Sequence, residues 1–457
     1  MSDTILAIDI GSIKISAIIA QINNGKIQIH GHGIANSRGI KKGAITNIEL
    51  ASKSIKKAVD DAKRIAGSNI TSATVSISNA YAKSLNSTGI VNIPNKEISV
   101  KEITRVIQTA QYNANVPPEY EIIHVLPYNF RVDEHDYIED PFGMNASRME
   151  VDINIVMTQK SNLSNLKKAV RSAGIEIDGI VLSGYASSIS TMNSDERDLG
   201  VAVIDLGGQT SNLVIHTGNS IRYNDFLGVG SNHITNDLSM ALHTPLNMAE
   251  NVKISYGNLI ETSDELIELP IIGDEENKNT ISLEIVHSVI FSRVEEALMI
   301  LEKSIDKSGL KDQIGAGIIL TGGMTKLKGI RELAQSIFSP LPVRIAYPGK
   351  VEGLFDQLKD PAFSTVVGLL IYRAGGHTPY EINFQQELMH SRDSFTDNLE
   401  VIKISNTVHD VKNKAKENRT EESLNNKETI VFDELLDIGK DNVNPIKKLT
   451  NWAKQLF

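Results

Sequence analysis

A strand–turn–strand pattern that occurs twice constrains the fold of this chain more than any other feature of its sequence. Residues 5–20 read ILAIDIGSIKISAIIA, and residues 201–215 read VAVIDLGGQTSNLVI. In each copy an apolar strand leads through an Asp-x-Gly turn into a second apolar strand. One such turn is often no more than a hairpin. Two copies, each followed by hydroxyl side chains, predict a duplicated domain with a cleft between the halves.

The length of the chain and its alternating pattern predict an α/β protein with more than one domain. Its 457 residues exceed what one ordinary hydrophobic core accommodates. Between residues 4 and 379, β-type apolar runs alternate with amphipathic helical patterns. Residues 47–66 predict a helix that Gly67 ends. Its apolar face is expected to comprise Ile48, Ala51, Ile55, Val59, Ala62 and Ile65.

Composition and charge exclude several classes of protein. The chain has no cysteine, which excludes disulfides and thiolate metal sites and favours a reducing cytoplasm. Its net charge of -10 argues against nucleic acid as a partner, because phosphates would be repelled. The first residues predict a strand and not a signal peptide, since Asp3 stands where a basic residue is expected. No stretch approaches the ~20 apolar residues that span a bilayer, so any membrane contact is expected to be peripheral.

The two turns carry the residue types of a phosphate clamp. Glycine lets the backbone approach phosphate oxygens, and hydroxyls and a lysine add donors. Asp9 and Asp205 are expected to face each other across the cleft and to hold Mg²⁺, mostly through water. The predicted phosphate and Mg²⁺ site comprises Asp9, Gly11, Ser12, Lys14, Asp205, Gly207, Gly208, Gln209, Thr210 and Ser211.

Two further segments are weaker signals when each is taken alone. Residues 318–327 read IILTGGMTKL, an apolar strand followed by paired glycines, against which a flat ring or a ribose can lie. Paired glycines also often just turn the chain. Residues 249–256 read AENVKISY and place Glu250 and Lys253 on one helical face, where a solvated ion pair is the ordinary interpretation.

The order and spacing of these segments are more specific than any one of them. DIGSIK, DLGGQT, LTGGMTKL and STVVGLLIY resemble the phosphate-1, phosphate-2, adenosine and connect-2 motifs of the actin/Hsp70/sugar-kinase superfamily. Within it, nearly the whole folded part is similar to the FtsA family of bacterial cell-division proteins. The resemblance implies an actin-like ATPase fold, with two duplicated domains around a nucleotide cleft that binds ATP and Mg²⁺. The residues it implies around the adenosine are Glu250, Lys253, Gly322, Gly323, Met324 and Lys326.

The resemblance also implies domain boundaries. Subdomain 1A would comprise 1–81, 164–195 and 361–384, and would be interrupted by an inserted subdomain 1C at 82–163, in place of actin's 1B. Subdomain 2A would comprise 196–230 and 311–360, and would enclose subdomain 2B at 231–310. Residues 266–280 are interpreted as a variable loop of 2B. Residues 385–443 lack proline and are rich in Asn, Lys, Glu, Asp and Ser, which predicts a disordered linker.

The chain departs from the family pattern at Gln209, where the second phosphate loop often has a third glycine. A side chain there is expected to crowd or hydrogen-bond the γ-phosphate. Fast hydrolysis needs a group that orients the attacking water. Residues 179–185 offer no carboxylate or amide for that purpose, and Asp178 just before them is the only candidate. We therefore assign no catalytic residue and expect ATP binding with at most slow hydrolysis.

The last fourteen residues, 444–457, predict an amphipathic helix that lies on a membrane surface. Asn444 suits the N-cap and Pro445 the first helical position. The apolar residues fall within an arc of about 140° at about 100° per residue. The alternative is a helix that docks on the protein itself, but the only Trp favours the headgroup boundary and the lysines favour anionic lipids. The expected membrane-binding residues are Ile446, Lys447, Lys448, Leu449, Trp452, Ala453, Lys454, Leu456 and Phe457.

The family resemblance implies a function that joins the cleft to the tail. The chain would polymerise on the cytoplasmic face of the cell membrane at the division septum and tether the tubulin-like protein FtsZ. The C-terminal tail of FtsZ would bind 2B, self-assembly would use 1A, 1C and domain 2, and downstream divisome proteins would also bind. The alternatives are a pilus-assembly relative, which lacks the terminal helix, a kinase and an Hsp70-type ATPase. The 1C-like insertion argues against a kinase. A C-terminal part made of linker and helix, with no β-sandwich peptide-binding domain, argues against an Hsp70-type ATPase.

Overall fold

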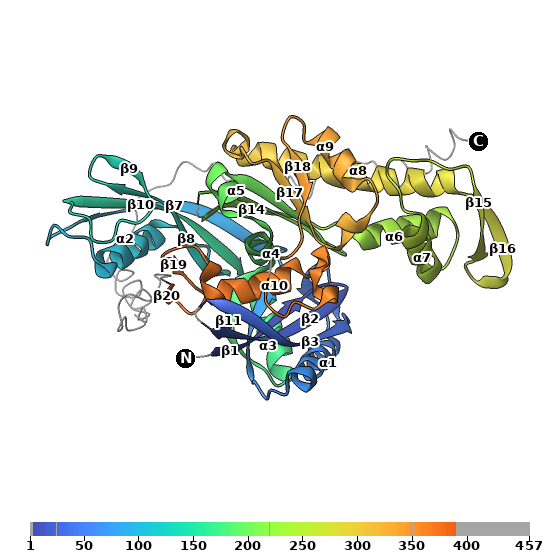
Figure 1. The fold of residues 1–457 in the computed structure, drawn as a ribbon, viewed down its shortest axis with the longest axis horizontal. Helices are drawn as coiled ribbons and strands as arrows, with labels where there is room; N and C mark the ends of the chain where they lie inside the picture. Colours follow the sequence, from blue (N-terminus) through green and yellow to red (C-terminus); the bar gives the residue numbers. More distant parts are fainter. Residues whose placement is uncertain (1–2, 24, 219, 350, 390–457) are drawn as a thin grey trace, which may run out of the picture. The chain divides into compact units, whose positions relative to one another are not determined.

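The first half of the duplication is a five-stranded sheet with strand order β11-β6-β1-β2-β3 (Figure 1). The computed structural model describes residues 3–23, 25–218, 220–349 and 351–389. Strands β1 and β2 form the first predicted hairpin, β3 extends it in antiparallel fashion, and β6 and β11 add in parallel on the other side. The strands are β1 (Asp3–Ile10), β2 (Lys14–Asn23), β3 (Lys26–Asn36), β6 (Ser72–Ile77) and β11 (Glu176–Leu182).

The second half repeats this topology strand for strand. Its order is β14-β13-β12-β17-β18, with an antiparallel meander on one side and two parallel strands on the other. The strands are β12 (Val201–Leu206), β13 (Ser211–Thr217), β14 (Ser220–Leu227), β17 (Ile318–Thr321) and β18 (Val343–Ile345). The predicted duplication is therefore confirmed by two sheets with the same connectivity.

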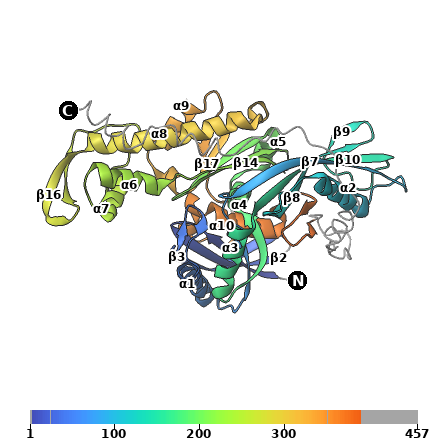
Figure 2. The same cartoon turned by 180° about the vertical axis from the view of Figure 1, so that it is seen from behind.

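Helix α1 (Ile48–Ala66) begins and ends where the sequence predicts. The Asn47 side chain accepts a hydrogen bond from Leu50 N–H, and Gly67 ends the helix in the left-handed conformation at φ 62°. The predicted apolar face is wrong at its last residue, because Ile65 is 46% exposed. Ile65 lies at the edge of the helical arc that faces the sheet, and the next residue, Ala66, packs against Gly31 of β3 instead. Helix α3 (Lys160–Ser172) packs beside α1 beneath the first sheet (Figure 2).

Two buried helices, α4 (Ser183–Thr191) and α10 (Ser364–Ile371), cross between the two sheets. All nine residues of α4 are buried. The helices touch through their backbones, because a Cβ at Gly368 would lie 1.8 Å from the Ala186 carbonyl oxygen. Ser190 Oγ donates to the Ser364 carbonyl oxygen at 2.7 Å across the same crossing. The crossing therefore leaves no room for a side chain at Gly368.

An insertion into the first half has its own sheet and its own hydrophobic core. Its sheet has the order β20-β19-β8-β10-β7, with β9 paired to β8, and α2 covers one face (Figure 1). The elements are β7 (Ala82–Asn92), α2 (Val100–Asn113), β8 (Tyr120–Val132), β9 (His135–Ile138), β10 (Arg148–Gln159), β19 (Glu381–Ile382) and β20 (Leu388–Met389). Strands β19 and β20 come from the end of the described chain, so that segment is attached to the insertion.

A buried carboxylate, Glu381, ties this sheet to the crossing helices. It accepts hydrogen bonds from Tyr372 Oη at 2.7 Å and Tyr185 Oη at 3.0 Å. His124 Nε2 accepts from Leu182 N–H, so the proton is on Nδ1, which donates to Glu381 at 2.6 Å. Both the glutamate and the histidine are fully buried. Burial, together with repulsion by Glu381, raises the pKa of both tyrosines well above the usual value.

The predicted variable loop at 266–280 is instead a β-hairpin in the second half. Strand β15 (Leu266–Ile271) pairs with β16 (Asp274–Ser282), and Gly273 lies in the turn at φ 82°. Ile267 and Leu269 face the core while their neighbours are exposed, an alternation that indicates a strand. The same region of the second half contains three helices, α6 (Ser231–Ala241), α7 (Leu246–Tyr256) and α8 (Leu283–Ser308).

The remaining strands and α-helices are short. They are β4 (Ile40–Lys41), β5 (Ala44–Ile45), α5 (Ser194–Leu199) and α9 (Ile330–Ile337). Within the ranges described above, no helix has the length and apolar character needed to span a bilayer. The predicted membrane helix at 444–457 and nearly all of the predicted linker lie outside the described residues.

Candidate functional site

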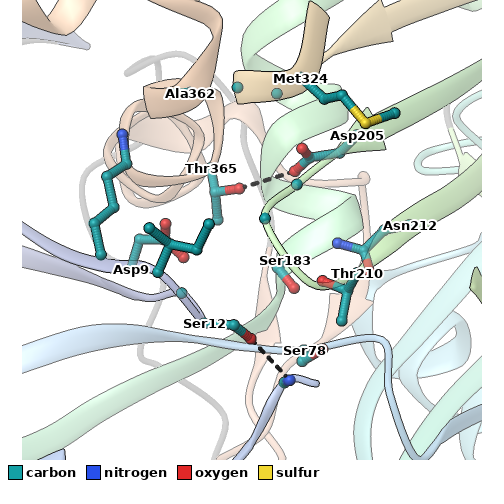
Figure 3. A pocket seen from close by; sticks show the side chains of 18 of the residues that line it. Asp9, Ser12, Ser78, Ser183, Asp205, Thr210, Asn212, Met324, Ala362 and Thr365 are labelled. Carbon is teal, nitrogen blue, oxygen red and sulfur yellow. Dashed lines mark hydrogen bonds between the residues drawn. The ribbon is translucent and has the colours of Figure 1, made fainter. Parts of the chain in front are cut away.

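A cavity of about 260 Å³ lies where the two Asp-x-Gly turns meet between the halves. Figure 3 shows Asp9, Ser12 and Thr365 on one side and Asp205 and Thr210 on the other. The predicted phosphate and Mg²⁺ residues that line the cavity are Asp9, Gly11, Ser12, Lys14, Asp205, Gly207, Gly208 and Thr210. Gly322, Gly323 and Met324, predicted to flank the adenosine, line it as well.

The two turns use glycine for the same steric reason. A Cβ at Gly11 would lie 2.7 Å from the Lys14 carbonyl oxygen, and one at Gly207 would lie 2.7 Å from that of Thr210. Neither turn therefore tolerates a side chain at this point. In the second turn Gly207 N–H also donates to the Thr210 carbonyl at 2.9 Å. Both turns thus present bare backbone to the cavity, as close approach to a ligand requires.

Asp9 and Asp205 place two buried carboxylates on this cavity, one from each half. Burial raises the pKa of Asp9, although the hydrogen bond that Ser76 Oγ donates at 2.8 Å opposes the shift. Burial and the neighbouring Asp9 raise the pKa of Asp205 to about 6. Thr365 Oγ1 donates to Asp205 at 3.3 Å. Two carboxylates that repel each other in a buried cavity are stabilised when a cation lies between them.

The donor set fits a hydrated divalent cation. Asn212 Oδ1 is buried on the cavity wall without a hydrogen-bond partner among the described residues. The Ser183 and Thr210 hydroxyls add further oxygen donors, as Figure 3 shows. The described ranges contain no group of three or more His, Asp or Glu side chains placed to hold a metal ion without water. Oxygen ligands with few carboxylates suit Mg²⁺, which keeps several of its waters.

Among the described residues that line the cavity, Lys14 is the one with a positively charged side chain. Its ammonium nitrogen lies 3.1 Å from the centre of the Phe363 ring, a cation–π contact that fixes the side chain at the wall. Burial lowers the pKa of Lys14 to about 8, although Asp9 and other nearby carboxylates oppose this shift. A phosphate beside it would favour the charged form, so Lys14 is suited to neutralising a buried anion.

Glu250 and Lys253 form the predicted ion pair on α7, but neither side chain lines the cavity. Their side chains are joined at 2.7 Å. Lys253 is only 8% exposed and also donates to Ser231 Oγ at 2.7 Å. Ser231 in turn lines the cavity. The pair therefore supports the start of α6, and Ser231 is the residue of this group that faces the cavity.

Three other predicted residues do not line the cavity. Lys326 is 62% exposed and pairs with Asp360 at 2.7 Å. Ser211 is buried and donates to the Val229 carbonyl at 2.9 Å. The Gln209 side chain accepts a hydrogen bond from Lys42 N–H at 2.8 Å. Asp178 accepts from Thr74 Oγ1 at 2.8 Å and does not line the cavity either.

Sequence reasoning missed several lining residues, among them Ser78, Ser183, Asn212, Ser231 and Thr365. The duplication itself held a signal for the first of them. Ser78 directly follows β6 and Gly322 directly follows β17, and these strands are equivalent in the two sheets. Applying the paired-glycine position of one half to the other would have found Ser78. The others lack an equivalent signal, since they come from helix ends and strand starts whose direction only packing decides.

Comparison with known proteins accords with this geometry. Residues 202–368 match the family model described as "Cell division protein FtsA", and residues 79–157 match "SHS2 domain inserted in FTSA". The chain is 40% identical to "Cell division protein FtsA" of Helicobacter pylori, over 86% of this chain and 87% of that relative. This identity extends across the insertion and both halves.

Solved structures at low identity share the fold. The "PilM-PilN type IV pilus biogenesis complex" is 17% identical with a TM-score of 0.58, over 81% of this chain and 98% of that one. "MreB5 of Spiroplasma citri bound to ADP" is 15% identical with a TM-score of 0.50, over 81% of this chain and 95% of that one. The predicted actin-like ATPase fold with a 1C-type insertion is confirmed. With two duplicated halves, the inserted domain and this degree of identity, the chain belongs to the FtsA family of cell division proteins.

Proposed function

We propose that the cavity binds ATP together with Mg²⁺. The observation that carries this proposal is the pair of buried carboxylates, Asp9 and Asp205, held between two bare glycine turns. Backbone N–H groups and the Ser12 hydroxyl would donate to phosphate oxygens, and Lys14 would neutralise their charge. When bound, Mg²⁺ would supply charge neutralisation of the phosphates. The backbone of Gly322, Gly323 and Met324 would lie against the adenosine.

The same residues support binding more than turnover. Gln209 and Asp178 do not line the cavity, and the side chain of each accepts a hydrogen bond from another segment of the chain. Among the described residues that line the cavity, Asp9 and Asp205 are the carboxylates, and holding the cation would occupy them. We therefore propose at most slow hydrolysis, with the bound nucleotide acting mainly on assembly.

The affinity for Mg²⁺-ATP is expected to fall as the pH is lowered from 7.5 to 5.5. Protonation of Asp205, with its pKa of about 6, competes with the cation. Calorimetric titration of the intact chain with ATP at both pH values, with and without Mg²⁺, measures this effect. A fall of several-fold is expected with Mg²⁺, and a much smaller one with EDTA. Equal affinity in all four titrations would contradict the assignment of the carboxylates to the cation.

We further propose that the chain polymerises and tethers FtsZ filaments to the inner face of the cytoplasmic membrane at the septum. Family membership supports this role in cell division. The FtsZ C-terminal tail would bind the 2B region, and self-assembly would use 1A, 1C and the faces of domain 2. The helix predicted at 444–457 would bind anionic lipids, reversibly in one subunit and stably in a polymer.

Removal of residues 444–457 is expected to abolish lipid binding while the fold and the cleft stay intact. Co-sedimentation with vesicles that contain anionic lipids, with and without ATP, compares the intact chain with one that ends at Val443. The intact chain should pellet, and more so with ATP, while the truncated chain should stay in the supernatant. Equal pelleting of the two chains would exclude the tail as the membrane anchor. Binding of an FtsZ tail peptide to both chains is the matched control for folding.

A further inference from the structure

A small hairpin of the first half, formed by β4 and β5, reaches the mouth of the cavity. Its two central residues, Lys42 and Gly43, have φ values of 49° and 77°. A two-residue hairpin turn with both φ values positive is tightly defined, and glycine is strongly favoured at its second position. Ile40 pairs with Ile45, and Lys41 with Ala44. The turn therefore holds its two N–H groups in fixed directions.

Each of these two N–H groups donates a hydrogen bond to a different Asp-x-Gly turn. One turn belongs to the first half of the molecule and the other to the second. Lys42 N–H donates to Gln209 Oε1 at 2.8 Å, in the turn of the second half. Gly43 N–H donates to Ser12 Oγ at 2.9 Å, in the turn of the first half, as the dashed line in Figure 3 shows. Because Ser12 Oγ accepts this bond, its hydroxyl proton stays available to a ligand.

Steric contacts seat the hairpin tip against the cavity wall. Gly43 lines the cavity, and a Cβ there would lie 2.2 Å from Ser78 Oγ. Beside it the two loops touch directly, since a Cβ at Gly208 would lie 2.1 Å from Ile13 Cδ1. The tip therefore lies on the line where the two halves meet at the phosphate end of the cavity.

We propose that the hairpin Ile40–Ile45 is a strap that closes the phosphate end of the nucleotide cleft, with Gln209 as the positioning residue that latches it. This inference rests on the proposed nucleotide binding. It gives Gln209 a role other than contact with the γ-phosphate. The strap joins the halves and must release the second loop before a nucleotide enters or leaves.

The strength of each contact between the halves decides which of them opens first. The crossing of α4 and α10 is buried and has backbone in direct contact with backbone. The bond between Lys42 and Gln209 is exposed and single. An exposed hydrogen bond contributes little net free energy, because water replaces it when it breaks. Local opening therefore occurs at the strap while the crossing stays packed.

A strap that opens equally in the free and bound protein predicts a specific kinetic signature. Gln209→Met keeps the length of the side chain and removes the acceptor oxygen. Association and release of a fluorescent ATP analogue should both become about threefold faster, the effect of losing one exposed hydrogen bond. The Kd should stay within about twofold of the unchanged protein. A lost contact with phosphate would instead raise the release rate and the Kd together. The matched control is Gln357→Met, at an exposed residue of the same type.

The absence of cysteine from the sequence allows a sharper test. In the variant Lys42→Cys, Gln209→Cys, a short, reducible bis-methanethiosulfonate reagent would link the strap to the second loop. Protein loaded with the fluorescent ATP analogue and then linked should release it at least about tenfold more slowly than the reduced variant. Protein linked before loading should not take up the analogue. Reduction should restore both rates, and the two single-cysteine variants should not respond.

Two contrary results are distinguishable. If the unchanged protein binds no ATP analogue in the presence of Mg²⁺, both the proposed function and the strap are overturned. If it binds, but linked and reduced proteins exchange nucleotide at the same rate, the cleft binds nucleotide and the strap does not gate it. A raised Kd for Gln209→Met with unchanged association would also overturn the strap, and would return Gln209 to the phosphate.

Discussion

Replacement of Asp205 by Asn is expected to raise the free energy of unfolding by about 2–3 kcal/mol at pH 8, while it weakens Mg²⁺-ATP binding at least about tenfold. The carboxylate is buried beside Asp9, and its pKa of about 6 lies well above the usual 3.8. Asparagine removes the buried charge and keeps an oxygen to accept from Thr365. The buried charge of Asp205 thus lowers the stability of the free protein and increases the affinity of the site for a cation.

The pH dependence of this gain has a definite sign. The folded protein binds the Asp205 proton more tightly than the unfolded chain does, because the folded pKa is raised. The contribution of Asp205 is therefore fully present below pH 3.8 and is lost as the pH rises through about 6. The difference between the two proteins should be small near pH 4 and reach its full value above pH 7. Denaturant unfolding without nucleotide or Mg²⁺ at these pH values measures it.

The control for this experiment is Asp136→Asn, which removes an exposed carboxylate. It should leave stability within about 0.5 kcal/mol at every pH. A lower stability of Asp205→Asn at pH 8 would show that the carboxylate is already compensated in the free protein. That result would contradict the repulsion between Asp205 and Asp9.

The substitution Glu381→Ala is expected to lower the free energy of unfolding by about 3–5 kcal/mol. It would leave three buried donors without their acceptor: His124 Nδ1–H and the Tyr185 and Tyr372 hydroxyls. It would also open a cavity where β19 joins the insertion sheet. The loss should concentrate on the contact between the insertion and the crossing helices.

A graded series tests whether the loss comes from this network. Tyr372→Phe removes one donor and keeps the ring, so it should cost about 1 kcal/mol. Glu381→Gln keeps the shape and one acceptor, and should fall between the two. Denaturant unfolding and hydrogen exchange on β8 and β19 give the global and local effects. If Glu381→Ala costs no more than Tyr372→Phe, the carboxylate does not organise the network.

The sequence predicted the parts of the fold that local chemistry decides. The two hairpins and the end of α1 at Gly67 need only short-range rules. The glycine turns and their aspartates were found for the same reason, because close backbone approach leaves a clear signature. Their convergence on one cavity followed from the duplication, since equivalent strands end at equivalent edges.

What the sequence did not predict depends on partners that are distant along the chain. The direction of the Gln209 side chain is set by Lys42, and the partners of Glu381 come from three other segments. No local sequence pattern predicts these side-chain contacts. The β15–β16 hairpin is a different case, because its alternation was present in the sequence and the family resemblance suggested a loop instead. Ile65 lies only at the edge of the apolar arc of its helix, and the neighbouring Ala66 fills the space against the sheet.

The close backbone contact between Gly368 and Ala186 makes the helix crossing a pivot point between the two halves. Two helices that touch this closely resist sliding, so relative motion of the halves is confined mainly to rotation about that point. Helix α8 has 26 residues and is about 39 Å long. If such a rod rotates by about 5° about one end, its other end moves by roughly 3 Å. A small angular change in the cleft is thereby converted into a displacement large enough for a neighbouring molecule to sense.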